Sequence, residues 1–197
     1  METIVILAGG RSRRMGRDKL ALPLDGKTLL ESVISRFEER FDSVYLSVAD
    51  AVKYPEIKTP RLVDIASGAG PLSGLHAALT LLPAEGVFLV AADLPFADPS
   101  AAQRIIELCN GHEACVLRLP GGFLEPLFGF YRRPVLKLCE DALSSGDYRM
   151  SEILHKAHTR FVEPSELGQF WDEKIIMNVN SPEDYQSLTA TNSCSYT

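Results

Sequence analysis

The chain has 197 residues, of which 46% are hydrophobic and 23% charged, and its formal net charge is −6 at pH 7. This composition is typical of a soluble globular protein and argues against intrinsic disorder. No apolar stretch approaches the length needed to span a bilayer. We expect a single domain over residues 1–190, large enough to bury about 70% of its unfolded surface. The polar residues 191–197 are expected to form a mobile tail.

The apolar runs predict strands that are buried on both faces, as in a parallel sheet. Each run is short and rich in β-branched residues: Thr3 to Ala8, Val44 to Val48, Val87 to Ala92, and Ala114 to Leu117. Because the first strand begins almost at Met1, there is no room for a cleaved signal peptide, and we expect a cytoplasmic protein that does not bind a membrane.

Helices are predicted between these strands. Thr28 and Glu31 have the spacing of a capping box, followed by an apolar stripe that runs to Phe37. A second helix carries leucines from Leu72 to Leu82, and Asp98 and Pro99 form the start of a third that extends to Cys109. Alternating strands and helices predict the α/β class: a Rossmann-like, three-layer α/β/α fold with a mainly parallel sheet.

The later part of the chain is less regular. Helices are expected over Pro134 to Leu143, Ser151 to Ala157 and Pro182 to Leu188, and extended segments over Leu124 to Tyr131 and Lys174 to Val179. The four cysteines show no C-x-x-C spacing, which argues against a zinc or redox site. We expect them to be reduced, with Cys109, Cys115 and Cys139 packed as small hydrophobic residues.

The stretch LAGGRSRRMGRDK, from Leu7 to Lys19, carries the strongest functional signal. Gly9 and Gly10 lack a Cβ, so their backbone can approach a base or phosphate, and five cations then follow within nine residues: Arg11, Arg13, Arg14, Arg17 and Lys19. A basic surface loop explains these residues equally well. The spacing excludes a Walker A loop and a dinucleotide fingerprint. One compact basic cluster in an acidic chain without interleaved aromatic residues also argues against binding nucleic acid.

This stretch resembles the signature L-A-G-G-x-S-x-R-M-G-x-D-K of the molybdenum cofactor guanylyltransferases. Four further segments resemble the family in the same order: GPLSGL from Gly70, VAADLPF from Val90, EPLFGFY from Glu125 and NVNSPEDY from Asn178. The resemblance implies a nucleotidyltransferase that moves GMP from GTP to the phosphate of a molybdopterin cofactor, with release of pyrophosphate. Further expected partners are other cofactor-biosynthesis proteins and the molybdoenzymes that accept the product.

The resemblance also implies roles for particular residues. The main chain of Leu7, Ala8 and Gly9 would contact the guanine base, with Gly10 in the turn beside it, and Asp64 would help to hold the nucleoside. Lys19 and Arg14 would bind phosphate and act in catalysis. Asp93 would bind Mg²⁺ and, through it, the nucleotide, while Asn178 and Asn180 would face the pterin. Without the resemblance, Asp93 is better explained as a turn or capping residue and Asp64 as an ordinary strand-end carboxylate. For Asn178 and Asn180, local turn and capping chemistry explains the residues equally well.

Two positions depart from the family pattern. Ala49 stands where an asparagine usually follows the second strand, and Glu125 stands where many members have histidine. These departures leave alternatives open: a related nucleotidyltransferase that uses CTP or another phosphorylated acceptor, or a nucleotide- or cofactor-binding module without catalysis. Gly9 argues against the cytidylyl relatives, which tend to have L-A-A-G at this point.

Overall fold

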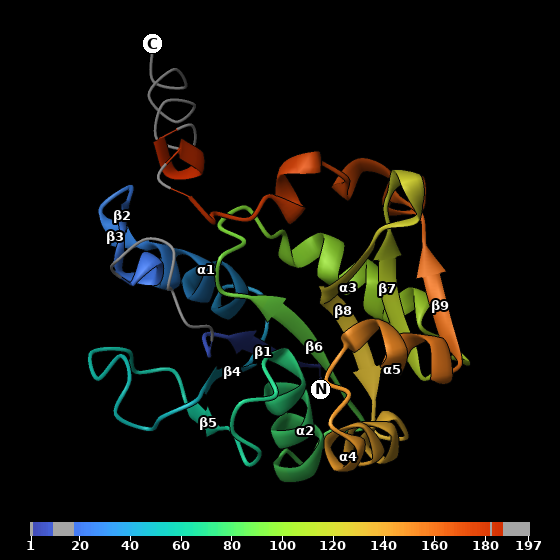
Figure 1. The fold of residues 1–197 in the computed structure, drawn as a ribbon. Coiled ribbons are helices and arrows are strands. Elements are labelled where there is room, and N and C mark those ends of the chain that lie inside the picture. The colour runs from blue at the N-terminus through green and yellow to red at the C-terminus, as the bar shows by residue number, and fades with distance from the viewer. Residues whose placement is uncertain (1, 10–17, 182, 187–197) are drawn as a thin grey trace.

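A seven-stranded sheet forms the centre of the computed structural model, which describes residues 2–9, 18–181 and 183–186 (Figure 1). The strand order is β5-β4-β1-β6-β8-β7-β9. Neighbouring strands are parallel, except that β8 runs antiparallel to both β6 and β7. The bounds are β1 Thr3–Leu7, β4 Ser43–Val48, β5 Arg61–Val63, β6 Gly86–Ala91, β7 Ala114–Arg118, β8 Leu124–Arg132 and β9 Thr159–Val162.

Helices cover both faces of this sheet (Figure 1). Helices α1 (Leu29–Glu38) and α3 (Pro99–Leu108) pack on one face, and α2 (Pro71–Leu81), α4 (Val135–Ser145) and α5 (Met150–Lys156) pack on the other. Successive residues of β1 point to opposite faces, so Ile4 and Ile6 join the first core and Val5 joins the second. The predicted three-layer fold with a mainly parallel sheet is confirmed.

The predicted helix starts are also confirmed. The Thr28 hydroxyl accepts a hydrogen bond from the Glu31 amide at 3.1 Å, and the Glu31 carboxylate accepts one from the Thr28 amide at 2.7 Å. The Asp98 carboxylate accepts from the amides of Ser100 and Ala101 at the start of α3. These caps satisfy amide groups that have no partner within the helix, which explains why each helix begins at that residue.

One predicted element is wrong. Lys174 to Val179 was expected to be extended, but Glu173–Ile176 forms a 3₁₀ helix, η4. Its cause is Asp172, whose carboxylate caps the turn by accepting from the Lys174 amide at 2.9 Å, while Ile175 is buried. In the segment expected to be helical from Pro182, residues 183–186 are helical, and residues 182, 187 and 188 lie outside the described residues, as does the tail 191–197.

Several short elements were not predicted. They are β5 and β9, the hairpin of β2 (Pro23–Leu24) and β3 (Lys27–Thr28), and the 3₁₀ helices η1 (Lys19–Ala21), η2 (Pro120–Gly122) and η3 (Pro164–Phe170). Each is too short to show a clear hydrophobic period. The hairpin and η1 nevertheless matter, because they lead the chain from Lys19 into α1.

The cysteines described by the structure behave as expected. Cys109, Cys115 and Cys139 are buried and have free thiols, and burial raises the pKa of the Cys139 thiol to about 12. Cys194 lies outside the described residues. Within the part of the chain that the structure describes, none of the helices has the length and apolar character that crossing a membrane would require.

Candidate functional site

The predicted site residues that the structure describes lie near the carboxyl edge of the parallel strands, where ligands bind in open α/β sheets. Gly9 follows β1, Asp64 follows β5 and Asp93 follows β6. The end of β1 is fixed on both sides. The Ala8 amide donates to the Ser47 carbonyl of β4 at 2.9 Å, and the Ala92 amide donates to the Leu7 carbonyl at 3.1 Å. This edge therefore has a defined backbone position before any ligand arrives.

Lys19 links three segments of the chain. Its ammonium lies 2.5 Å from a carboxylate oxygen of Asp93 and 2.9 Å from the side-chain oxygen of Asn180. Both Lys19 and Asp93 are largely buried, with 18% and 22% of their side chains exposed. Lys19 is the first residue of η1, which is capped by Asp18 through the Leu20 amide. The structure thus brings together a cation, a carboxylate and an amide that sequence analysis placed in three separate motifs.

Asn180 is held in place by the segment around it. The Val179 amide donates to the Asp93 carbonyl at 3.0 Å, and the Val179 side chain is buried. The amides of Asn180 and Ser181 both donate to the Asp184 carboxylate, and these bonds lower the pKa of Asp184. The C-terminal segment is therefore fixed against the end of β6. Asn178 is half-buried on the same segment, and its pterin-binding role stays a prediction.

Glu125 belongs to the same neighbourhood because β8 runs past the end of β6. Val90 pairs with Phe128 in an antiparallel register, so the residues before Phe128 extend beyond β6 toward Asp93. A register shift in the β7–β8 pairing, a bulge, accommodates Pro126 inside the sheet. Burial raises the pKa of the Glu125 carboxyl, and the negative charge of Asp93 raises it further. Two carboxylates therefore act on one another at this edge.

These carboxylates fit a magnesium ion. Across residues 2–9, 18–181 and 183–186, no group of three or more histidine, cysteine, aspartate or glutamate side chains is placed to hold a metal ion. Mg²⁺ does not require such a cage, because it is usually held by one or two carboxylates together with substrate phosphates and water. The hard oxygen donors of Asp93 and Glu125 match that pattern.

Gly9 and Asp64 lie together on the other side of β1. A Cβ on Gly9 would stand 3.6 Å from the Asp64 carboxylate and 3.9 Å from the Ala49 amide nitrogen. The Ser47 hydroxyl donates to Asp64 at 3.2 Å. Burial raises the pKa of Asp64, and this hydrogen bond opposes that shift. Ala49 thus borders the site at the position where the family pattern has an amide.

Helix α2 approaches this edge closely because Gly74 has no side chain. A Cβ at Gly74 would come within 2.5 Å of a Leu7 methyl group and 2.6 Å of the Ser47 hydroxyl. The residue before the helix, Gly70, has φ +61°, a conformation that favours glycine. Glycines of the GPLSGL segment therefore set the position of α2 against β1 and β4.

Some expected residues lie outside the described part of the chain. They are Gly10 and Arg14, with the neighbouring cations Arg11, Arg13 and Arg17. Sequence analysis also missed Lys53, whose ammonium is 3.5 Å from the Ala8 carbonyl oxygen. A single lysine in an irregular segment belongs to no motif, so no sequence signal could have identified it.

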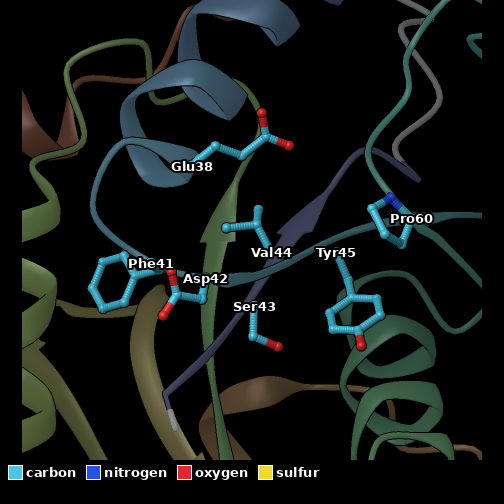
Figure 2. A pocket seen from close by; sticks show the side chains of 7 residues that line it. All are labelled: Glu38, Phe41, Asp42, Ser43, Val44, Tyr45 and Pro60. Atoms are coloured by element: carbon cyan, nitrogen blue, oxygen red, sulfur yellow. The ribbon is translucent and has the colours of Figure 1, made fainter.

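A cavity of about 330 Å³ occurs at the opposite end of the sheet (Figure 2). It is lined by the start of β4, by Glu38 and Asp42, and by Pro60. Figure 2 shows Tyr45 and Val44 of the strand beside these residues. None of the residues predicted to bind nucleotide or pterin lines it. The candidate site is therefore the carboxyl edge.

Comparisons with known proteins identify the family of the chain. The model of the MobA-like NTP transferase domain family matches residues 4–161. A probable molybdenum cofactor guanylyltransferase from Thermococcus kodakarensis is 34% identical, with 93% of this chain and 92% of that protein aligned. One from Methanosarcina mazei is 32% identical, with 93% and 88% aligned.

A solved structure has the same fold. The molybdopterin-guanine dinucleotide biosynthesis protein A of Archaeoglobus fulgidus superimposes with a TM-score of 0.85 over 98% of this chain and 99% of that one, at 23% sequence identity. This likeness shows the fold, and the family model and the relatives above show the family. The chain belongs to the MobA-like nucleotidyltransferase family and, within it, to the molybdenum cofactor guanylyltransferases.

Proposed function

We infer that the protein transfers GMP from GTP to the terminal phosphate of a molybdopterin cofactor, giving the guanine dinucleotide form and pyrophosphate. The observation that carries this inference is the contact of Lys19 with both Asp93 and Asn180, in a chain whose relatives are named for this reaction. Lys19 and Asp93, which are expected to act at the phosphates, thus lie next to Asn180, which is expected to bind the pterin.

In the proposed reaction, an oxygen of the pterin phosphate attacks the α-phosphorus of GTP in line. The bond from that phosphorus to the bridging oxygen of pyrophosphate breaks, and pyrophosphate leaves with the electron pair. Because the attacking oxygen is already anionic, no strong general base is needed. The protein's task is to position the two substrates and to stabilise the charge that develops between them.

Lys19 is suited to this task. An ammonium group has three hydrogen-bond donors, so Lys19 can bind a phosphate oxygen while it keeps Asp93 and Asn180 as partners. Its neighbours fix its position before the nucleotide binds, which reduces the entropy lost on binding. Arg14 is proposed to bind phosphate oxygens beside it with its planar guanidinium.

Mg²⁺ is proposed as the cofactor, and Asp93 with Glu125 would hold it. When bound, it would neutralise charge on the phosphate oxygens. The base would lie against the main chain of Leu7, Ala8 and Gly9, near Asp64. The pterin would lie against Asn178 and Asn180.

The remaining expectations belong to the same proposal. A cytoplasmic location is supported by the free thiols of the buried cysteines, since disulfides are rare in that compartment. Because the guanine dinucleotide product is a cofactor, a molybdoenzyme must receive it, and other proteins of cofactor biosynthesis must supply the acceptor.

The proposal is tested by replacing Asp93 with asparagine, which keeps the shape and removes the charge. We expect GTP-dependent pyrophosphate release to fall at least about a hundredfold, because the carboxylate that would hold the magnesium ion at the phosphates is lost. Asp141→Asn is the matched control, since Asp141 forms an exposed ion pair with Lys137 on α4. Full turnover by Asp93→Asn would contradict the proposed role of Asp93.

A nucleotide panel tests the reaction itself. The wild-type protein should release pyrophosphate with GTP and a molybdopterin acceptor, and much less with CTP. A preference for CTP would identify a cytidylyl transferase instead. Binding of GTP without pyrophosphate release from any pterin acceptor would indicate a binding module.

A further inference from the structure

The segment between β4 and β5, residues 49–60, is built around Arg61. The Arg61 guanidinium donates to the carbonyl of Lys53 at 3.3 Å, to that of Tyr54, and to that of Ile57 at 3.0 Å. Tyr54 and Ile57 are both buried in the core between the sheet and helices α1 and α3. Figure 1 shows this segment extending beyond the edge strand β5 before it returns to the sheet. Its base is thus fixed by one cation and two buried side chains.

Tyr54 gives this segment a particular conformation. Its φ is +53°, a left-handed value that is rare for a bulky aromatic residue and persists only where surrounding contacts impose it. Its hydroxyl donates to the Asp18 carboxylate at 2.7 Å. Asp18 directly precedes Lys19, so this contact joins the β4–β5 segment to the residues that carry the phosphate-binding cation.

Lys53 is directed toward the end of β1 by the same contacts. Its ammonium lies 5.0 Å from the centre of the Tyr54 ring, 4.0 Å from the Asp18 carboxylate and 3.5 Å from the Ala8 carbonyl oxygen. About a third of the side chain, 34%, is exposed. A partly exposed ammonium therefore stands beside the last residues of the strand.

Two ammonium groups consequently flank the end of β1. Lys19 lies on the β6 side with Asp93, and Lys53 lies on the β4 side, where Ala8 is bonded to Ser47. If Lys19 binds the phosphates, the nucleoside extends toward the other side. Gly9, Ala49 and Asp64 meet there.

We propose that Lys53 is a specificity-determining residue that donates a hydrogen bond to O6 of the guanine base. This inference rests on the proposed function, because it takes GTP as the nucleotide. Guanine presents the acceptors O6 and N7 on one edge, whereas adenine and cytosine carry an amino donor at the position corresponding to O6. An ammonium group only donates, so it favours guanine and disfavours the other two. Lys53 also supplies a donor next to Ala49, which has no polar side chain.

The test compares nucleotides that differ in the polar groups of the base. Dissociation constants are measured by calorimetry for GTP, for ITP, which keeps O6 but lacks the 2-amino group, and for 2-aminopurine riboside triphosphate, which lacks O6 and the N1 proton. The loss of the N1 proton is the same for every protein, so the role of Lys53 is read from the difference between wild type and variant. The proteins are wild type, Lys53→Met, which keeps an unbranched apolar stem, and Lys58→Met, a control at an exposed lysine of the same segment.

We expect Lys53→Met to bind GTP and ITP about tenfold more weakly than the wild type, the usual loss for a hydrogen bond to a charged group. Its dissociation constant for the 2-aminopurine nucleotide should stay nearly unchanged. The preference of GTP over ITP should stay the same. Lys58→Met should bind all three as the wild type does, and Lys53→Arg should retain the preference for O6. Because the ratios compare nucleotides on one preparation, they hold even if a variant is partly unfolded.

Equal weakening of all three nucleotides by Lys53→Met would overturn the inference, since it would indicate contact with phosphate or a purely structural role. An unchanged preference for O6 in Lys53→Met would overturn it as well. If the wild type releases pyrophosphate from GTP in either case, the proposed function stands and only the role of Lys53 is wrong. If the wild type does not bind GTP, both fail.

Discussion

Glu125 is an ionisable residue in an environment that disfavours its charge. It is half-buried at the end of the sheet and faces the field of Asp93, and both effects raise the pKa of its carboxyl. Its one hydrogen bond that opposes the shift comes from the Leu127 amide at 3.1 Å. A cation bound with the substrate would offset the repulsion between Glu125 and Asp93. This repulsion therefore destabilises the free protein but not the protein with its ligands bound.

Glu125→Gln is therefore expected to stabilise the free protein near pH 7. Because the folded-state pKa is raised, the wild-type carboxyl is favourable while protonated and becomes unfavourable as the pH rises through that pKa. The free energy of unfolding of Glu125→Gln should therefore exceed that of the wild type at neutral pH. This difference should vanish at pH values below the ordinary range of glutamate. Thermal unfolding at both pH values, in EDTA, measures it.

The control for this prediction is Glu140→Gln, at an exposed position on α4. The stability of Glu140→Gln should not exceed that of the wild type at neutral pH. A Glu125→Gln protein that is less stable than the wild type at neutral pH would mean that the carboxylate makes a favourable contact that outweighs its burial. The pyrophosphate-releasing activity of Glu125→Gln should fall although its stability rises, because residues that serve a site often lower the stability of the protein.

At the scale of elements, the contact of α2 with β1 and β4 depends on the missing side chain of Gly74. In Gly74→Ala, the new methyl group would press on Leu7 and Ser47, both closer than 3 Å. We expect the free energy of unfolding to fall by about 1–3 kcal/mol, as is usual for overpacking. Displacement of Ser47 would also weaken its hydrogen bond to Asp64, so GTP binding should weaken too. Denaturant unfolding and calorimetry measure the two effects.

Leu81→Ala serves as the control on the same helix, because Leu81 is 55% exposed. Its stability should change by less than about 0.5 kcal/mol. If Gly74→Ala is as stable as Leu81→Ala, the sheet edge can accommodate a methyl group, and the close approach of α2 is not required.

The elements show which parts of the fold could be predicted. Helices α1 and α3 have local start signals in Thr28 and Asp98, and the buried strands β1 and β6 are uninterrupted apolar runs, so both kinds of element could be predicted. Strand β5 has three residues and is defined by its pairing with β4, a contact far away in the sequence. At η4 the apolar run resembled a strand, but the capping residue Asp172 formed a turn.

The residues of the candidate site likewise divide into those with a local sequence signal and those placed by tertiary contacts. Asp93 and Asp64 were predicted because they match motifs of the family, and both follow strand ends, where an α/β sheet places its ligands. Lys19 was predicted because it belongs to a dense motif. Lys53 reaches the site only through the fold of residues 49–60 on Arg61, a tertiary contact with no local pattern. The approach of Asn180 to Lys19 likewise depends on the Val179 contact with the end of β6.

For the whole molecule, the site lies where several segments meet at one edge of the sheet, so a ligand bound there joins them. We expect Mg²⁺ and GTP, at about 100 times the dissociation constant, to stabilise the protein by about 2.7 kcal/mol. For a chain of this length the melting temperature should rise by about 5–10 °C. Differential scanning calorimetry checks this, with EDTA expected to reduce the rise.

ATP at the same concentration is the control for this shift. An equal rise with ATP would mean that the phosphates provide nearly all of the binding and the base contributes little. An unchanged rise in EDTA would argue against the proposed magnesium ion.

The contact between Lys19 and Asn180 joins residues that are 161 positions apart. During synthesis at about 5–20 residues per second, the ribosome adds Asn180 about 8–30 seconds after Lys19. Strands β1, β4 and β6 and their helices can assemble in that interval, whereas the asparagine partner of Lys19 does not yet exist. A nascent chain can thus acquire its core well before it acquires a complete site, and its chemistry can begin only after the segment with Asn180 has been made.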